Sequence, residues 1–196
     1  QKNRALDLAT GDWVFSIDAD ERVTPELARE IQAVVAGEGA LTGYTVPRLS
    51  SFCGRFIRHS GWWPDRVLRL FRRGSARFSD AIVHEKVVPQ ESPGKLQAPL
   101  LHYTYPDLES ALTKMNRYSS DAAQAMYDRG KRTSLPGILG RSAWTFIRIY
   151  GLRRGFLDGR HGVLLAVVAA MGSFSRYAKL WLMQQQLPPR PPYEEP

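Results

Sequence analysis

The first fifty residues alternate between short apolar runs and polar breaks. Residues 13–17 are apolar and rich in β-forming side chains, and the run stops at an acidic group at 18–21. Residues 3–10 carry alanine and leucine at helical spacing, which predicts the end of a helix leading into this strand. Residues 42–47 form a second predicted strand, whose length is limited by Pro47.

A helix is predicted between these two strands. Thr24 is a suitable N-cap, and Pro25 fits the first turn. Gly37 is expected to end the helix. Its apolar face is expected to consist of Leu27, Ile31, Val34 and Val35. A strand, a helix and a strand in this order predict an α/β fold.

The middle of the chain predicts short strands and loops. Residues 50–65 are typical of a loop, and strands are expected at 66–72, 81–88 and 100–103. The strand at 81–88 is interrupted by His84 and Glu85, and residues 89–99 are a Pro- and Gly-rich loop.

From Asp107 the apolar residues recur every three or four positions, which predicts a helix to about residue 128. A break containing Pro136 is expected at 130–140, followed by helices at 141–150 and 162–185. The nine-residue apolar run at 163–171 is too short to span a bilayer, which needs roughly 20 apolar residues. The expected organisation is an α/β region at 1–106, a basic helical appendage at 107–186 and a flexible tail at 187–196.

Composition excludes several classes of protein. Hydrophobic residues make up 43% of the 196 residues, which excludes a disordered or low-complexity chain. Cys53 is the single cysteine, which excludes a disulfide framework and a cysteine-rich zinc site. The formal charge is +8, and residues 129–182 hold ten Lys and Arg against one acidic residue. Such a basic segment attracts phosphate on nucleic acid, lipid head groups or substrate, or is a solvated helix face.

The acidic group at 18–21 is the sharpest chemical signal. Ligands of α/β sheets bind at the carboxyl ends of strands, where Asp18 and Asp20 are expected to lie. Paired carboxylates suit Mg²⁺ or Mn²⁺, which would bridge to a diphosphate. An ordinary acidic turn is the alternative. Arg22 stands where dehalogenase-type phosphatases need Thr or Val, and the chain has neither a Walker-type phosphate loop nor a dinucleotide-binding loop.

Several motifs in order resemble the family-2 glycosyltransferases of the GT-A fold, in particular bacterial lipopolysaccharide-core β-glucosyltransferases. They are Ser-Ile-Asp-Ala-Asp-Glu at 16–21, Gly-Trp-Trp-Pro-Asp at 61–65, Arg-Leu-Phe-Arg at 69–72, Val-His-Glu at 83–85, His-Tyr at 102–103 and Gly-Phe-Leu-Asp-Gly at 155–159. The resemblance implies an incomplete GT-A, Rossmann-like mixed sheet followed by a C-terminal helical segment. It also implies that strand–helix units holding the nucleotide precede Gln1, and that this piece alone lacks full activity.

The resemblance further implies an inverting transfer of a hexose from a nucleotide-diphosphate sugar. Asp18 and Asp20 would face the diphosphate, with Asp20 the direct ligand of a divalent cation and His102 completing the metal shell. Glu85 is the expected catalytic base, and Asp65 is the second candidate. Each of these side chains has an ordinary structural alternative, such as a solvent-facing carboxylate or a core histidine.

Contacts to the substrates are expected from a wider set of residues. Arg69 and Arg72 would bind the donor diphosphate, unless they face solvent. At least one of the two tryptophans is expected in the core. The residues predicted to contact substrate are Trp62, Trp63, His84 and Glu21.

The aromatic and basic residues of 141–182 predict a peripheral contact with an anionic membrane, as a lipid-linked or lipopolysaccharide-core acceptor requires. The enzyme is therefore expected in the cytoplasm, at the inner face of the plasma membrane. The alternative is an inactive fragment that serves as a basic nucleic-acid- or membrane-binding module, although no nucleic-acid-binding motif is present and no such partner is expected.

Overall fold

The computed structural model describes residues 2–37, 41–78, 87–89 and 91–185. The chain divides into two compact units. The sheet unit contains the residues up to Arg58 and Trp62–Thr104, and the helical unit contains His59–Gly61 and the residues from Tyr105 onward. The chain therefore leaves the sheet unit at residues 59–61, returns to it at Trp62, and leaves it again after Thr104.

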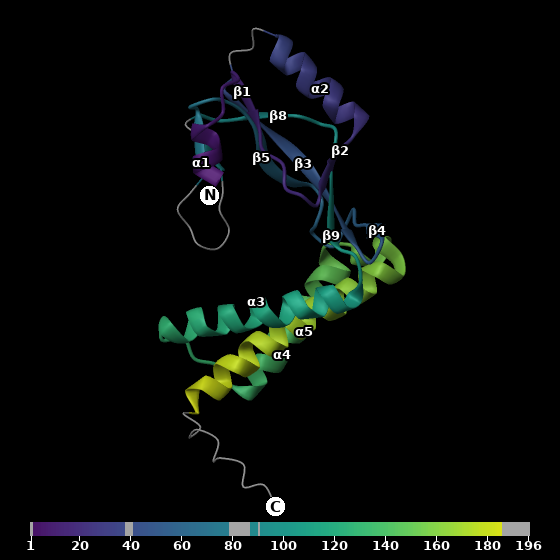
Figure 1. The fold of residues 1–196 in the computed structure, drawn as a ribbon. Coiled ribbons are helices and arrows are strands. Elements are labelled where there is room, and N and C mark those ends of the chain that lie inside the picture. Colours follow the sequence, from purple (N-terminus) through teal and green to yellow (C-terminus); the bar gives the residue numbers. More distant parts are fainter. Residues whose placement is uncertain (1, 38–40, 79–86, 90, 186–196) are drawn as a thin grey trace, which may run out of the picture. The chain divides into compact units, whose positions relative to one another are not determined.

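The sheet unit is built on one mixed sheet (Figure 1). Its strands follow the order β1-β5-β3-β9-β2, and β4 and β8 also pair with β3. The β3–β8 pair is parallel, whereas β1–β5, β3–β5, β3–β4 and β2–β9 are antiparallel. The strands are β1 (Trp13–Phe15), β2 (Glu21–Val23), β3 (Gly43–Phe52), β4 (Arg55–Phe56), β5 (Asp65–Arg72), β8 (Gly94–Lys95) and β9 (Leu100–Tyr105).

One short helix and a pair of short strands also belong to this unit. Helix α1 (Lys2–Asp7) precedes β1, and β6 (Ala76–Phe78) pairs antiparallel with β7 (Val87–Pro89). Of the strand predicted at 81–88, only its end falls within the described residues. His84 and Glu85 lie outside them, as does the tail predicted at 187–196.

Helix α2 (Pro25–Ala36) packs on the sheet as its sequence predicts. Thr24 caps it by accepting a hydrogen bond from Leu27 N at 3.2 Å, and its hydroxyl also donates to Pro99 O. Leu27 is fully buried, and Ile31 and Val34 pack against the same core. That core consists of Leu27, Val46, Leu70, Leu96, Ala98 and Leu100. Val35, however, is 46% exposed, so its place on the apolar face was predicted wrongly.

The prediction that Pro47 limits the second strand is also wrong, because β3 continues to Phe52. A proline removes one donor from a ladder, but its neighbours keep pairing with β5, as Val46 does with Val67 and Arg48 with Asp65. The extra length matters because it brings Arg48 and Ser50 into the sheet.

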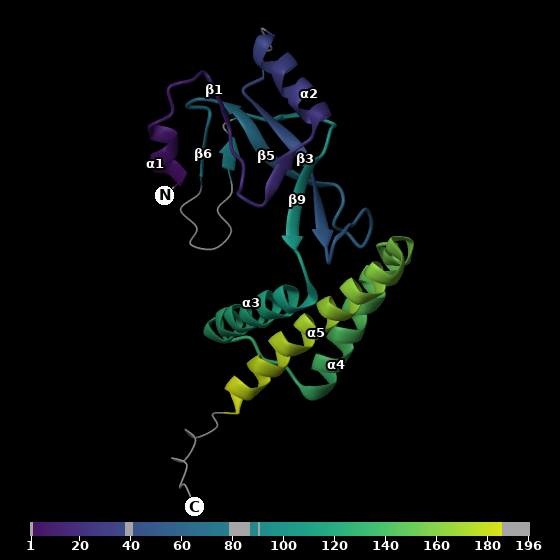
Figure 2. The ribbon, with the colours of Figure 1, turned by 45° about the vertical axis from the view of Figure 1, so that its right-hand side comes forward.

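The helical unit contains three long helices, α3 (Leu108–Asp128), α4 (Leu135–Ile147) and α5 (Gly159–Gln184). A π-helical turn, Arg148–Leu152, and a 3-10 turn, Gly155–Asp158, connect α4 to α5. Helices α4 and α5 lie side by side in both views (Figures 1 and 2). The expected break at 130–140 is shorter than predicted, because Pro136 lies in the first turn of α4, where a missing N–H costs nothing.

Polar contacts fix this unit internally. Lys179 of α5 donates to four oxygens of α3, which belong to Asn116, Ser119 and Ser120, at 2.7–2.9 Å. The buried carboxylate of Asp158 accepts hydrogen bonds from the backbone N–H of His59 and from the Ser60 hydroxyl, the latter at 2.9 Å. The His59 ring also contacts it at 3.1 Å.

The C-terminal helix is longer than its apolar run suggested. Among the described residues, one helical segment, Gly155–Gln184, is long and apolar enough to cross a membrane by length and composition, and only 28% of its 18-residue apolar window is buried. The interpretation that residues 163–171 are too short to span a bilayer therefore underestimated this segment. Length and composition alone do not distinguish a spanning helix from the core helix of a soluble protein.

Candidate active site

The acidic group lies in the turn between β1 and β2. Two hydrogen bonds close this turn, one from Glu21 N to Asp18 O and one from Asp18 N to Glu21 Oε2, each at 3.0 Å. Neighbouring strands hold its ends, because Ser16 N donates to Arg69 O of β5 and Tyr103 N of β9 donates to Asp20 O. The carboxylates at 18, 20 and 21 are therefore fixed to the sheet.

Glu21 is the buried centre of the site. Its side chain is fully covered, and its Oε1 contacts Arg69 Nη2 and lies 3.7 Å from Arg48 Nη1. Arg69 is itself almost completely buried, and its Nε has no hydrogen-bond partner among the described residues. Glu21 thus holds two guanidinium groups through one carboxylate. A direct contact from Glu21 to substrate, as predicted from sequence, does not agree with this burial.

Asp18 is paired with two cations. Its Oδ2 lies 2.6 Å from Arg69 Nη2, and its Oδ1 lies 3.0 Å from Lys2 Nζ. Burial by itself would raise the pKa of Asp18, but the hydrogen bonds from Lys2 and Arg69 outweigh it and hold this pKa below its ordinary value. The carboxylate is therefore ionised at neutral pH, and its negative charge is already balanced by Lys2 and Arg69.

Asp20 is paired differently, with the imidazole of His102. The distance from Asp20 Oδ2 to His102 Nε2 is 3.3 Å, and the carboxylate is 47% exposed. The other ring nitrogen, Nδ1, lies within 3.0 Å of the hydroxyls of Ser50 and Thr104. Burial and the nearby Arg48 charge lower the pKa of His102 despite the opposing effect of Asp20, so the ring is neutral at pH 7.

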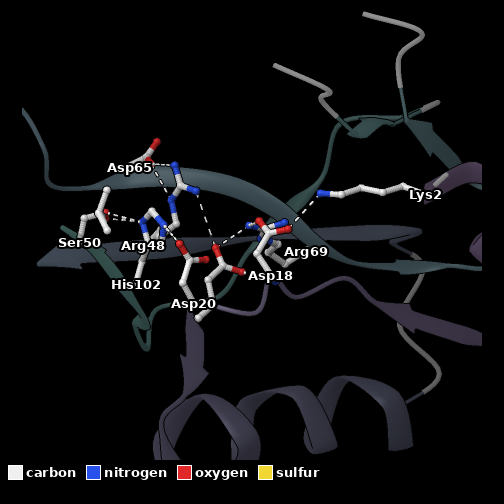
Figure 3. A network of polar contacts seen from close by, with 10 residues as sticks. Lys2, Asp18, Asp20, Arg48, Ser50, Asp65, Arg69 and His102 are labelled. Carbon is white, nitrogen blue, oxygen red and sulfur yellow. Dashed lines mark hydrogen bonds and ion pairs between the residues drawn. The ribbon is translucent and has the colours of Figure 1, made fainter. Parts of the chain in front are cut away.

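Arg48 extends this network to Asp65. Its Nε and Nη2 atoms donate to Asp65 Oδ2 at 2.9 and 2.6 Å. Figure 3 shows these side chains pointing toward one another, with Asp65 and Lys2 at opposite ends of the network. Two arginines and four carboxylates from three strands and one turn therefore form one polar cluster, in which the pairing of β2 with β9 sets the Asp20–His102 pair beside the ion pairs of Glu21.

Curated relatives give this cluster a chemical context, although no family model matches the sequence. The chain is 30% identical over 192 residues to the "Lipopolysaccharide core biosynthesis glycosyltransferase LpsC" of Rhizobium meliloti, covering 91% of this chain and 69% of that protein. It is 29% identical to an uncharacterized glycosyltransferase of Rickettsia typhi and 28% identical to one of Rickettsia prowazekii, with 92% of this chain and 65% of each relative covered.

The chain belongs to this family of glycosyltransferases. It spans about two thirds of the length of the curated relatives that it matches. The resemblance inferred from motif order is therefore confirmed, and the mixed α/β fold with a C-terminal helical segment agrees with a partial GT-A sheet.

The cation expected for a glycosyltransferase has two candidate ligands in this site. Within the described ranges, no group of three or more His, Cys, Asp or Glu side chains is arranged to hold a metal ion. Asp20 and His102 are nevertheless close together, and the imidazole is neutral, as a metal ligand requires. Mg²⁺ typically uses one or two protein ligands together with substrate phosphates and water, so this pair fits. The ion pairs of Asp18 argue against its direct coordination.

Three other predicted site residues lie outside the polar cluster. The Arg72 guanidinium lies over the Trp13 ring, 4.9 Å from its centroid, and is not directed at the acidic turn. Trp62 makes an edge contact with Phe52, and Arg58 lies over the ring of Trp63. Both tryptophans are partly exposed, so the prediction that one belongs to the core is wrong.

The sequence interpretation missed the residues that connect the cluster. Arg48, Ser50 and Thr104 had no motif signal, and Lys2 lies just before the helix end predicted at 3–10. A signal existed for Arg48 and Ser50, because β3 contains polar residues in a strand that is otherwise largely apolar. The assignment of 50–65 to a loop hid this pattern.

Proposed function

We propose that this glycosyltransferase is an inverting family-2 enzyme of the GT-A fold. Its donor would be a nucleotide-diphosphate hexose, and its acceptor a lipid-linked or lipopolysaccharide-core saccharide. The observation that carries the proposal is the acidic turn at 18–21, fixed between β5 and β9 and joined to His102. The name of the Rhizobium meliloti relative, a glycosyltransferase of lipopolysaccharide core biosynthesis, supports the acceptor class.

The donor end of the site centres on Asp20 and His102. We infer that these two side chains hold a divalent cation, Mg²⁺ or Mn²⁺, which when bound would neutralise charge on the departing diphosphate. Ser50 and Thr104 would orient the His102 ring through Nδ1. Arg69 is almost completely buried and already paired with Asp18 and Glu21, so it would hold these carboxylates in place and would not itself bind the diphosphate.

The acceptor end requires a base. The acceptor oxygen forms a bond to the anomeric carbon while the bond from that carbon to the diphosphate breaks, and the acceptor proton passes to a carboxylate. Asp65 is a poor candidate, because its Oδ2 already accepts two hydrogen bonds from Arg48. Protonation of Asp65 would remove the negative charge that pairs with Arg48. Glu85, outside the described residues, is therefore the proposed base.

The proposed acceptor implies a place of action. A lipid-linked saccharide is made at a membrane, so we propose that the enzyme works peripherally at the inner face of the plasma membrane. The excess of Lys and Arg in residues 129–182 supports contact with anionic lipid.

The test compares two variants of the full-length enzyme. Glu85→Gln should leave the affinity for a uridine-diphosphate sugar unchanged while lowering the transfer rate by about 10²–10⁴-fold. Asp20→Asn should weaken Mn²⁺-dependent donor binding and transfer together. Donor binding is measured by calorimetry, and transfer by release of nucleoside diphosphate.

Asp121→Asn is the matched control, because Asp121 is an exposed carboxylate of α3 in the helical unit. This substitution should change neither the donor affinity nor the transfer rate. Equal donor affinity of Asp20→Asn and the unmodified enzyme, with and without Mn²⁺, would contradict the proposed cation site. Full transfer by Glu85→Gln would remove that residue from the mechanism.

A further inference from the structure

Helix α5 presents a continuous apolar stripe that the sugar-transfer site does not use. Val163, Val167, Met171 and Phe174 recur every three or four residues, so they share one face of the helix. Each is between 38% and 47% exposed. Leu182 extends the same face by two further turns and is 46% exposed. A soluble helix normally buries such a stripe.

Helix α4 adds its own exposed apolar residues beside this stripe. Leu135, Leu139 and Ile147 are each more than half exposed. Between α4 and α5 lies a groove of about 580 Å³, with Phe146 on one wall and Val167, Met171 and Phe174 on the other. We call the exposed apolar residues of α4 and α5, together with the groove between them, the α4–α5 face. It is an apolar surface with a groove in it.

The charge around the α4–α5 face indicates the chemistry of its partner. Residues 129–182 hold ten Lys and Arg, and the single acidic residue in this range, Asp158, is buried under His59 and Ser60. An apolar surface within a strongly basic segment is complementary to anionic head groups above acyl chains. It is poorly suited to a basic protein partner, which the same charge would repel.

The packing of α5 on α3 decides how such a membrane contact is oriented. Lys179 is held by four oxygens of α3, and Met115 of α3 lies against Gly172, where an added Cβ would meet it at 3.0 Å. Helix α3 carries Glu109, Asp121 and Asp128. If α5 crossed the bilayer, it would have to take these charges into hydrocarbon or lose the four hydrogen bonds of Lys179.

We propose that the α4–α5 face is a docking surface for an anionic lipid bilayer, on which α4 and α5 lie in the plane of the interface. Lipid tails fill the groove between Phe146 and Phe174, and basic side chains of the unit contact the head groups. The inference rests on the peripheral membrane location proposed above and names the surface that makes the contact. It makes residues 155–184 an interfacial segment, although their length and composition would also suit a span.

The test is vesicle flotation of the full 196-residue chain, without nucleotide sugar. Vesicles of phosphatidylcholine containing phosphatidylglycerol should bind the chain, whereas vesicles of phosphatidylcholine alone should bind it weakly. The double substitution Met171→Gln with Phe174→Gln should reduce binding about tenfold or more, because both side chains would otherwise enter the lipid. High salt should weaken binding as well.

Tyr118→Gln is the matched control, since Tyr118 is an equally exposed aromatic residue of α3 outside this face. It should bind vesicles like the unmodified chain, and circular dichroism should show the same helix content for all three proteins. Release of the bound chain by alkaline carbonate supports the in-plane orientation, whereas resistance to extraction would overturn it in favour of a span.

Other occupants of the face give different results. Undiminished flotation of the double variant would exclude the face as the lipid contact. Absence of flotation, together with a dimer that the double variant abolishes in sedimentation, would assign the face to a second copy of the chain. Donor binding is measured separately, so failure of this inference leaves the proposed transfer reaction untouched.

Discussion

At the residue scale, the organising feature is a buried carboxylate between one buried and one partly buried guanidinium group. Glu21 is fully covered, and its partners Arg48 and Arg69 carry the contacts onward to Asp65 and Asp18. A buried ion pair stabilises a protein little in net terms, because desolvation opposes the attraction. Removing one partner is costly, however, because the remaining charge has then lost both its water and its counter-ion.

Glu21→Gln should therefore lower the free energy of unfolding by about 3 kcal/mol. The amide keeps the shape of the side chain but leaves Arg69 and Arg48 without their shared negative partner. Urea denaturation measures the loss. Glu26→Gln is the control, because Glu26 is an exposed residue whose contact with Arg29 spans 3.5 Å, and it should cost less than about 0.5 kcal/mol. Similar losses for the two variants would show that Glu21 is not the centre of the network.

At the element scale, glycines decide how closely the turns before α5 pack. A Cβ at Gly162 would lie 1.9 Å from the backbone oxygen of Gly155 and 3.1 Å from Asp158 Cβ. The 3-10 turn Gly155–Asp158 therefore folds back onto the first turns of α5 only because residue 162 has no side chain. The sequence shows a glycine there, but the contact with residue 155 follows from the packing.

Gly162→Ala should destabilise the helical unit by about 1–3 kcal/mol, because backbone atoms cannot move aside as a flexible side chain can. Gly140→Ala is a control in which the stability of the unit is expected to change in the opposite direction. Nothing lies within 4 Å of an added Cβ at Gly140 in α4, so alanine should stabilise the unit by about 0.5–1 kcal/mol. Urea unfolding followed by circular dichroism distinguishes the two, and a stabilising Gly162→Ala would contradict the close contact.

At the scale of the whole molecule, the chain enters the helical unit twice. His59–Gly61 belong to this unit, although they lie 98 residues before Asp158 in the sequence. The buried Asp158 carboxylate holds this early segment through three donor groups, two on His59 and one on Ser60. Asp158 therefore fixes a segment of the helical unit that is distant from it in the sequence.

Asp158→Ala should therefore destabilise the helical unit by about 3 kcal/mol, because it leaves the buried donors of His59 and Ser60 unsatisfied. Asp158→Asn keeps one acceptor oxygen and should therefore destabilise the helical unit less than Asp158→Ala. Hydrogen exchange at the His59 amide, which donates to Asp158, should rise strongly in the alanine variant, more than at the Ser60 amide, which donates to Arg153 O. An alanine variant with unchanged exchange at these amides would show that other contacts hold the segment.

The sequence by itself determined the local elements and the family of this protein. Thr24, Pro25 and Gly37 set the limits of α2, and Asp107 sets the start of α3, because caps and breaks act within a few residues. The order of short motifs was enough to identify a glycosyltransferase. Periodicity also located the acidic turn at the end of β1.

Only the tertiary structure decided how the acidic residues are used. Asp18, Asp20 and Glu21 are neighbours in the sequence, yet their surroundings differ. Asp18 is paired with Lys2 and Arg69, Asp20 is paired with His102, and Glu21 is buried. These differences depend on partners 16 to 82 residues away, which no local pattern specifies. The pairing of β3 with β5 and β9 brings those partners to the turn, because sheet register joins residues that are distant in the chain.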